Sequence, residues 1–131
     1  MNEQTSIPTS IAPWLSVRNI VEAVNFYKSA FGAIEAYRLE EPPEVLQVAK
    51  LSIDGAEFWL SEDSGIDNPS SESPGRNLIR MILMVSDPDK IFNKALEAGA
   101  SQVFPVGEDH GWRLGRLVDP FGFHWEIGRP L

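Results

Sequence analysis

The stretch that decides the fold lies near the C-terminus and reads Arg116-Leu117-Val118-Asp119-Pro120-Phe121-Gly122-Phe123-His124-Trp125-Glu126-Ile127-Gly128. Two apolar runs flank an Asp-Pro-Phe-Gly segment, in which proline fixes φ and glycine can take a positive φ, so the stretch predicts a β-hairpin. In the second arm, three apolar side chains alternate with His124 and Glu126, which gives one apolar face and one face with an imidazole and a carboxylate. Because a carboxylate on the inner face of a strand needs a partner or a functional role, Glu126 is the first candidate site residue.

Composition limits the possible functions. The chain has 131 residues, 43% of them hydrophobic, which suits one compact domain or two small interlocked modules. Its 19 acidic and 11 basic residues give a formal charge of -8, which disfavours nucleic acid and anionic membranes as partners and mildly favours cationic ligands. The lack of cysteine excludes disulfides and thiolate chemistry. Without a run of about 18 apolar residues or a signal-like N-terminus, the sequence predicts a soluble, cytoplasmic protein.

The first half of the chain predicts the element order β-α-β-β-β after a polar tail at residues 1–10. The expected elements are a strand at 11–17, a helix from near Ile20 to Gly32, a strand at 33–39, and a hairpin of strands at 45–53 and 56–60. Asn19 is a good N-cap for the helix, and Gly32 can end it. Asp54-Gly55 is typical of a two-residue hairpin turn. These elements form a predicted first module at residues 11–61.

The second half repeats this order after a linker at residues 62–76 that is rich in turn-forming residues. The expected elements are a strand at 78–85, a helix that follows Asp87-Pro88 and ends at Gly99, a strand at 101–106, and the closing hairpin at 112–127. The second module therefore spans residues 77–131. Whether the linker closes over a cavity as a lid is left open by the sequence.

The two halves also match residue by residue. Leu15-Ser16-Val17-Arg18-Asn19 aligns with Leu83-Met84-Val85-Ser86-Asp87, Phe31-Gly32-Ala33 with Ala98-Gly99-Ala100, and Gly55 with Gly122, at offsets of about 67 to 68 residues. This spacing predicts an internal duplication. Two units of about 55 residues are hardly stable singly, so joining them is the physical reason to duplicate.

A set of segments spread over residues 11–129 carries a family resemblance. The segments are Trp14-Leu15-Ser16-Val17, Ala23-Val24-Asn25-Phe26-Tyr27-Lys28-Ser29-Ala30-Phe31-Gly32-Ala33, Ala95-Leu96-Glu97-Ala98-Gly99-Ala100, Gly111-Trp112-Arg113-Leu114-Gly115-Arg116 and Asp119-Pro120-Phe121-Gly122-Phe123-His124-Trp125-Glu126. With them the chain resembles the vicinal oxygen chelate superfamily, which includes glyoxalase I, bleomycin-resistance proteins and extradiol dioxygenases. The resemblance implies an α+β fold in which two βαβββ modules form a cupped mixed sheet around a central cavity, with helices on the outer face. It also implies a homodimer, whose cups are built within one chain or across two.

The resemblance further implies four metal-ligand positions, early on the first strand and on the last strand of each module. With the repeat offsets, these positions fall on Ala12, Trp59, Arg80 and Glu126. A divalent ion needs several histidine or carboxylate ligands and is repelled by a guanidinium, so we expect no metal and no cofactor. A rearranged metal site at His124 and Glu126 is the minority hypothesis. His110 lies in a polar loop and is expected to be solvated.

Other side chains on the predicted cavity face favour binding. Arg80 and Glu126 are expected to face the same cavity and to form an ion pair, which either binds a ligand or only neutralises itself. Strand alternation directs Trp14 and Trp59 into the cavity, and Trp112 joins them if its strand follows the register of the first module. Indole rings on such a face attract planar aromatic compounds or cations. Trp125 lies on the opposite face and is expected in the core.

Three functions stay open on this sequence. The first is metal-independent binding of a small aromatic or cationic molecule, as in bleomycin-resistance proteins, by Trp14, Trp59, Arg80, Trp112, His124 and Glu126. The second is a metal-dependent lyase or dioxygenase of the glyoxalase kind, with Glu126 as catalytic base or ligand. The third is a non-catalytic dimeric interaction module. Fold-level analogy alone does not choose among them.

Overall fold

The computed structural model describes residues 10–42, 44–63 and 79–131, so nearly all of the predicted tail and linker lies outside the described residues. The elements are, in order, β1 (Trp14–Val17), α1 (Ile20–Phe31), β2 (Ile34–Glu40), β3 (Leu46–Ile53), β4 (Ala56–Glu62), β5 (Met81–Met84), α2 (Pro88–Ala98), β6 (Ser101–Asp109), β7 (Trp112–Val118) and β8 (His124–Pro130). The predicted order of two βαβββ modules is confirmed. Strands β1 and β5 are shorter than predicted, and β6 extends three residues beyond its predicted end at position 106.

Short-range signals in the sequence set the limits of both helices. The side chain of Asn19 caps α1 by accepting a hydrogen bond from the backbone amide of Glu22 at 3.1 Å. Gly32, with φ 72°, ends this helix in a left-handed conformation that costs glycine little. Asp87 caps α2 in the same way, accepting from the amide of Lys90 at 3.2 Å. Neither helix is long and apolar enough to cross a membrane.

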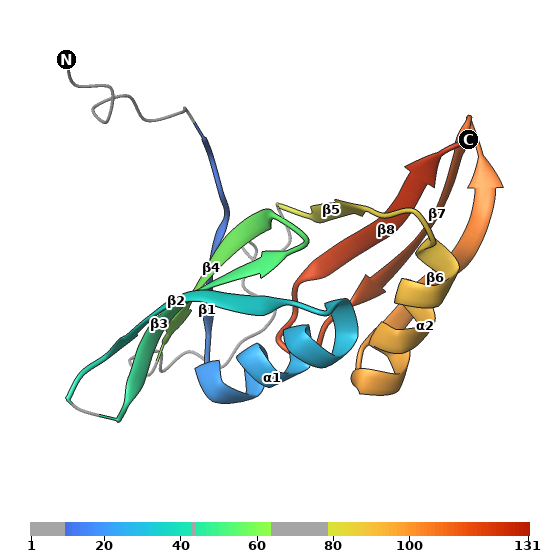
Figure 1. The fold of residues 1–131 in the computed structure, drawn as a ribbon. Helices are drawn as coiled ribbons and strands as arrows, with labels where there is room; N and C mark the ends of the chain where they lie inside the picture. The colour runs from blue at the N-terminus through green and yellow to red at the C-terminus, as the bar shows by residue number, and fades with distance from the viewer. Residues whose placement is uncertain (1–9, 43, 64–78) are drawn as a thin grey trace, which may run out of the picture.

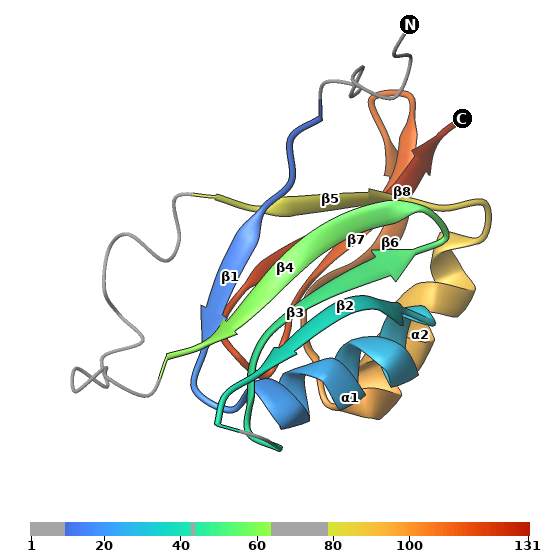
Figure 2. The ribbon, with the colours of Figure 1, turned by 60° about the vertical axis from the view of Figure 1, so that its left-hand side comes forward.

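The two modules have the same sheet topology. The first sheet has the strand order β1-β4-β3-β2, which can be followed in Figure 2, and the second has the order β5-β8-β7-β6. In each sheet the first strand of the module runs parallel to its last strand, and the other neighbours are antiparallel. The β3–β4 hairpin turns at Asp54 and Gly55, whose φ angles of 51° and 97° are those of the tight turn predicted for this dipeptide.

The modules meet through their helices. Figure 1 shows α1 and α2 side by side, with the first sheet on one side of the pair and the second sheet on the other, and helix against helix is the main contact between modules. One core joins both modules: Tyr27 of α1 contacts Phe58 of β4 and Trp125 of β8, at ring-centroid distances of 5.2 and 5.7 Å. Trp125 is 3% exposed, which confirms its predicted place in the core.

A buried carboxylate fixes the closing hairpin onto α1. Asp119 is 3% exposed, and its Oδ2 accepts hydrogen bonds from the Tyr27 hydroxyl at 2.5 Å and from Trp125 Nε1 at 2.8 Å. Its Oδ1 accepts from the backbone amides of Phe121 and Phe123, each at 2.9 Å. Burial raises the pKa of Asp119, and these four hydrogen bonds oppose the rise. The aspartate of the predicted turn thus shapes the turn and ties the second module to the first.

Each sheet has one face covered by its helix and one open face. On the first sheet, the covered face buries residues such as Leu15, Leu51 and Leu60. The open face exposes large apolar side chains instead, among them Trp14, Ile34, Tyr37 and Leu39 on the first sheet and Ile82, Met84, Phe104 and Trp112 on the second. Within the described residues the two sheets stay separate, so the cup implied by the resemblance is divided between two open faces of one chain.

Candidate functional site: two matching rows on the open faces

The open face of the first sheet carries a row of side chains that crosses all four strands. The strand register aligns Trp14 of β1 with Trp59 of β4, and it continues through Lys50 of β3 to Tyr37 of β2. We call these four residues the aromatic row. The indoles of Trp14 and Trp59 stack with centroids 5.7 Å apart and an interplanar angle of 20°, and Tyr37 meets Trp59 edge-on at 5.8 Å. The row is a preformed aromatic platform.

Polar contacts hold this platform in place. Trp14 is 55% exposed, and its Nε1 donates a hydrogen bond to Ser61 Oγ at 3.0 Å. The ammonium of Lys50 lies 4.9 Å from the centroid of the Trp59 ring and 3.5 Å from a carboxylate oxygen of Glu57. The Trp59 ring therefore already contacts a cation of the protein itself.

The open face of the second sheet carries an equivalent row with different chemistry. The register aligns Ile82 of β5 with Glu126 of β8, and continues through Arg116 of β7 to Phe104 of β6. We call these four residues the charged row. Its members follow those of the aromatic row by 66 to 68 positions, so the duplication places Ile82, Glu126, Arg116 and Phe104 where the first module has Trp14, Trp59, Lys50 and Tyr37. In both rows the third residue in sheet order, on β3 or β7, is cationic. The fourth, on β2 or β6, is aromatic.

Two diagonal contacts connect the charged row to its neighbours. Arg80, next to β5, forms an ion pair with Glu126, with 3.1 Å between Nε and Oε2. Arg116 Nε donates a hydrogen bond to His124 Nδ1 at 3.2 Å. Burial lowers the pKa of His124, and the positive charges of Arg116 and Arg80 lower it further. The structure thus brings Arg116 together with Arg80, His124 and Glu126 on the open face of the second sheet. The sequence had singled out the last three of these residues.

Comparisons with known proteins agree with this architecture. A model of the family described as glyoxalase At5g48480-like, N-terminal domain, matches residues 15–62. An uncharacterized protein of Mycobacterium bovis is 35% identical over 132 residues, in a match that covers 96% of this chain and 86% of the relative. The chain belongs to the vicinal oxygen chelate superfamily.

Solved structures extend the likeness in fold to nearly the whole chain. TioX from Micromonospora sp. ML1 has a TM-score of 0.76 at 24% identity, covering 95% of this chain and 100% of TioX. A glyoxalase/bleomycin resistance protein/dioxygenase family enzyme from Burkholderia phytofirmans PsJN has a TM-score of 0.69 at 19% identity, covering 90% of this chain and 95% of that one. At these identities the likeness concerns the fold alone.

Three of the four metal-ligand positions that the resemblance implies carry residues that do not bind a divalent ion. Of the positions implied by the resemblance, Trp59 belongs to the aromatic row and Arg80 to the ion pair, which leaves Glu126 as the one possible metal ligand of the set. Among the described residues no three histidines and carboxylates are grouped for an ion. The side chain of His110 is 82% exposed beside Asp109, as expected for a solvated loop residue.

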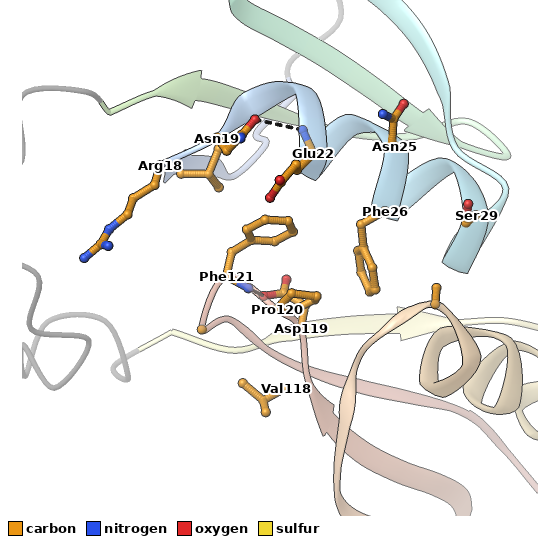
Figure 3. Close-up of a pocket in the computed structure, with 13 residues that line it drawn as sticks. Arg18, Asn19, Glu22, Asn25, Phe26, Ser29, Val118, Asp119, Pro120 and Phe121 are labelled. Atoms are coloured by element: carbon orange, nitrogen blue, oxygen red, sulfur yellow. Dashed lines mark hydrogen bonds between the residues drawn. The ribbon is translucent and has the colours of Figure 1, made fainter.

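A hollow of about 950 Å³ lies away from these rows, between α1 and the turn at residues 119–122. Figure 3 shows the rings of Phe26 and Phe121 on its walls, with Asn19 and Glu22 at the start of the helix above them. Its buried carboxylate, Asp119, is already bonded to four donors. Because the buried carboxylate of this hollow is used within the fold, whereas the open faces carry the aromatic row and the charged row, we place the candidate site on the open faces.

Sequence reasoning missed some members of the two rows, and it placed Trp112 in one group with tryptophans of the other sheet. Lys50, Tyr37 and Arg116 were not identified, although the offset of about 67 residues and strand alternation together mark them as equivalent positions facing the cavity side. Trp112 lies on β7 of the second sheet, whereas Trp14 and Trp59 share the first sheet. Within one chain, the structure therefore brings two of the three tryptophans together.

Proposed function

We propose that this protein binds a small planar aromatic molecule without a metal ion. The observation that carries the proposal is the aromatic row, in which Trp14 and Trp59 stack on the sheet face that neither of the two described helices covers. Stacked indoles, of which Trp14 is 55% exposed and Trp59 is partly buried, offer a flat apolar surface with little side-chain entropy to lose on binding. Of the two small-molecule functions considered, binding needs no quartet of metal ligands, whereas the lyase or dioxygenase does. Membership of a family described as glyoxalase-like agrees with a small-molecule role and leaves the ligand open.

We also propose that two chains build each binding cup. The modules of one chain join helix to helix, so its two open faces do not close on each other. In a symmetric homodimer, the first sheet of one chain faces the second sheet of its partner, and the arrangement occurs twice. This dimer would cover apolar side chains such as Ile34, Ile82 and Met84, which are 63%, 62% and 44% exposed in the single chain.

The charges on the open faces favour the aromatic over the cationic class of ligand. Lys50 already lies against Trp59, and Arg80 and Arg116 flank Glu126 on the other face. A cationic ligand meets repulsion from all three. The enzymatic alternative requires Glu126 as a free base or metal ligand, whereas its carboxylate is engaged by Arg80.

The test is isothermal titration calorimetry with the uncharged probe 2-naphthamide, together with sedimentation equilibrium of the protein. We expect saturable binding to a dimer, and a loss of about tenfold or more in affinity for Trp59→Ala, because one stacking contact is removed. Val21→Ala, which removes an exposed apolar side chain of α1, is the matched control and should bind as the wild type does.

Other outcomes separate the alternatives. An unaltered affinity in Trp59→Ala would contradict the aromatic site, and a monomer that binds the probe would contradict the two-chain cup. Stoichiometric divalent metal in the purified protein would favour the lyase or dioxygenase. A dimer that binds no small molecule would favour the interaction module.

A further inference from the structure

On the second open face, one cation has no carboxylate partner among the described residues. Arg116 is half-buried on β7, directly across from Glu126 in the register, yet Glu126 pairs with Arg80. Among the described arginines, Arg38, Arg80 and Arg113 each form an ion pair with a carboxylate. With the residues that the structure describes, Arg18, Arg116 and Arg129 form none, and of these three Arg116 alone is partly buried. In a chain with a formal charge of -8, an unpaired guanidinium on a partly buried, apolar face is an unusual feature.

The hydrogen bond of Arg116 determines the state of the neighbouring imidazole. A guanidinium Nε always carries a proton, so it donates to His124 Nδ1, which must hold the lone pair. The imidazole proton is then on Nε2, and His124 is neutral. The lowered pKa of His124 agrees with this assignment. The cluster of Arg80, Arg116, Glu126 and His124 therefore holds two positive charges and one negative charge.

This cluster has donors left for a ligand. In the described part of the chain, the two terminal amino groups of Arg116 have no hydrogen-bond partner, and its Nε alone is used. The two terminal amino groups together match the spacing of carboxylate oxygens. Phe104 and Ile82 at the ends of the same row supply apolar walls, being 40% and 62% exposed. A charged hydrogen bond on such a face is stronger than one in open solvent.

The first open face repeats the cation at the equivalent place. Lys50 stands in the aromatic row where Arg116 stands in the charged row. If the two faces meet across a dimer, which rests on the proposed function, a ligand between them has a lysine from one side and an arginine from the other. The indoles of Trp14 and Trp59 then lie against its planar body.

We propose that the ligand is an aromatic carboxylate, whose anionic group binds to Arg116 and the Nε2 proton of His124 while its ring stacks on the aromatic row. This narrows the proposed binder to one ligand class. It also reverses the preference for cations that the acidic composition of the chain suggests, because positive charge gathers locally on the open faces.

The experiment uses three probes of one shape and different charge: 2-naphthoate, 2-naphthamide and 2-naphthylmethylammonium. Calorimetric titration of the wild-type protein should give an affinity for the naphthoate about tenfold or more above that for the amide, with the ammonium the weakest. Arg116→Gln should remove most of this preference, because the affinity for the naphthoate falls by a larger factor than the affinity for the amide. Arg116→Lys, which keeps the charge and loses the planar fork, should be intermediate.

Arg129→Gln is the matched control, because it removes the same charge from an exposed position on β8. It should keep the preference for the naphthoate, which separates a local contact from the overall charge. Thermal melts followed by circular dichroism establish that each variant is folded.

The outcomes distinguish this inference from the proposed function. If the amide binds as tightly as the naphthoate, or if Arg116→Gln keeps the wild-type preference, the carboxylate site is wrong and the aromatic binder stands. If none of the three probes binds at millimolar concentration, both proposals fail.

Discussion

Replacing Asp119 with asparagine should destabilise the fold far more than a change of one atom suggests. The carboxylate accepts four hydrogen bonds, two at each oxygen: from Tyr27 and Trp125 on one side, and from two backbone amides of its own turn on the other. An asparagine amide presents one oxygen and one NH₂ group, so two of the four donors face another donor.

The expected magnitude follows from which donors can adjust. The asparagine side chain should keep its oxygen toward the two backbone amides, because these donors cannot move. Its NH₂ group then points toward Tyr27 and Trp125. The tyrosine hydroxyl can rotate to accept, but the indole N–H cannot, and it remains buried without a partner. One buried orphan donor, with the weakening of three charged hydrogen bonds, gives a loss of about 2–4 kcal/mol in the free energy of unfolding. At about 4 °C per kcal/mol, the melting temperature should fall by on the order of 10 °C.

Urea unfolding followed by tryptophan fluorescence measures this loss, since Trp125 belongs to the network. Tyr27→Phe removes a donor without leaving an orphan and should cost about 1–2 kcal/mol. In the double variant the two losses should fall short of additive by about 1 kcal/mol, because the groups share one hydrogen bond. Asp109→Asn, at an exposed aspartate, is the control and should change stability by less than about 0.5 kcal/mol. A similarly small change in Asp119→Asn, or full additivity, would refute the reasoning.

Two further predictions concern the open face of the second sheet. The lowered pKa of His124 means that its contribution to stability is present above the unfolded-state value of 6.5 and is lost as pH falls through the lower folded-state pKa. Between about pH 7.5 and 5.5 the melting temperature should therefore fall more in the wild type than in His124→Gln, and parallel curves would contradict this. Gly128→Ala should cost about 1–3 kcal/mol, since the new Cβ would lie 2.5 Å from Leu114 Cβ. Gly107→Ala, where nothing lies within 4 Å, is its control, and equal stability of the two variants would argue against the steric explanation.

Local signals in the sequence were sufficient for the elements and their repetition. Helix limits at Asn19 and Gly32, and the turn at Asp54-Gly55, depend on contacts within a few residues, which the sequence displays directly. The alternation in the closing hairpin correctly separated the core residue Trp125 from the open-face residue Glu126. The offset between halves also led to the Arg80–Glu126 ion pair, which the structure confirms.

What the sequence could not decide depends on how elements far apart in the chain sit together. Periodicity assigns a side chain to a face, but it does not say which residue of the next strand lies beside it, so the contact of Arg116 with His124 was not foreseen. The same limit explains why Trp112 was grouped with two tryptophans of the other sheet. Nor does any local pattern indicate that α1 packs against α2, or that Asp119 of the closing hairpin bonds to Tyr27 of α1, 92 residues away in the chain. By itself the sequence determined the two modules and the faces of their strands. The tertiary structure decided which side chains meet on those faces and that both faces stay open, because such contacts depend on register and packing between distant segments.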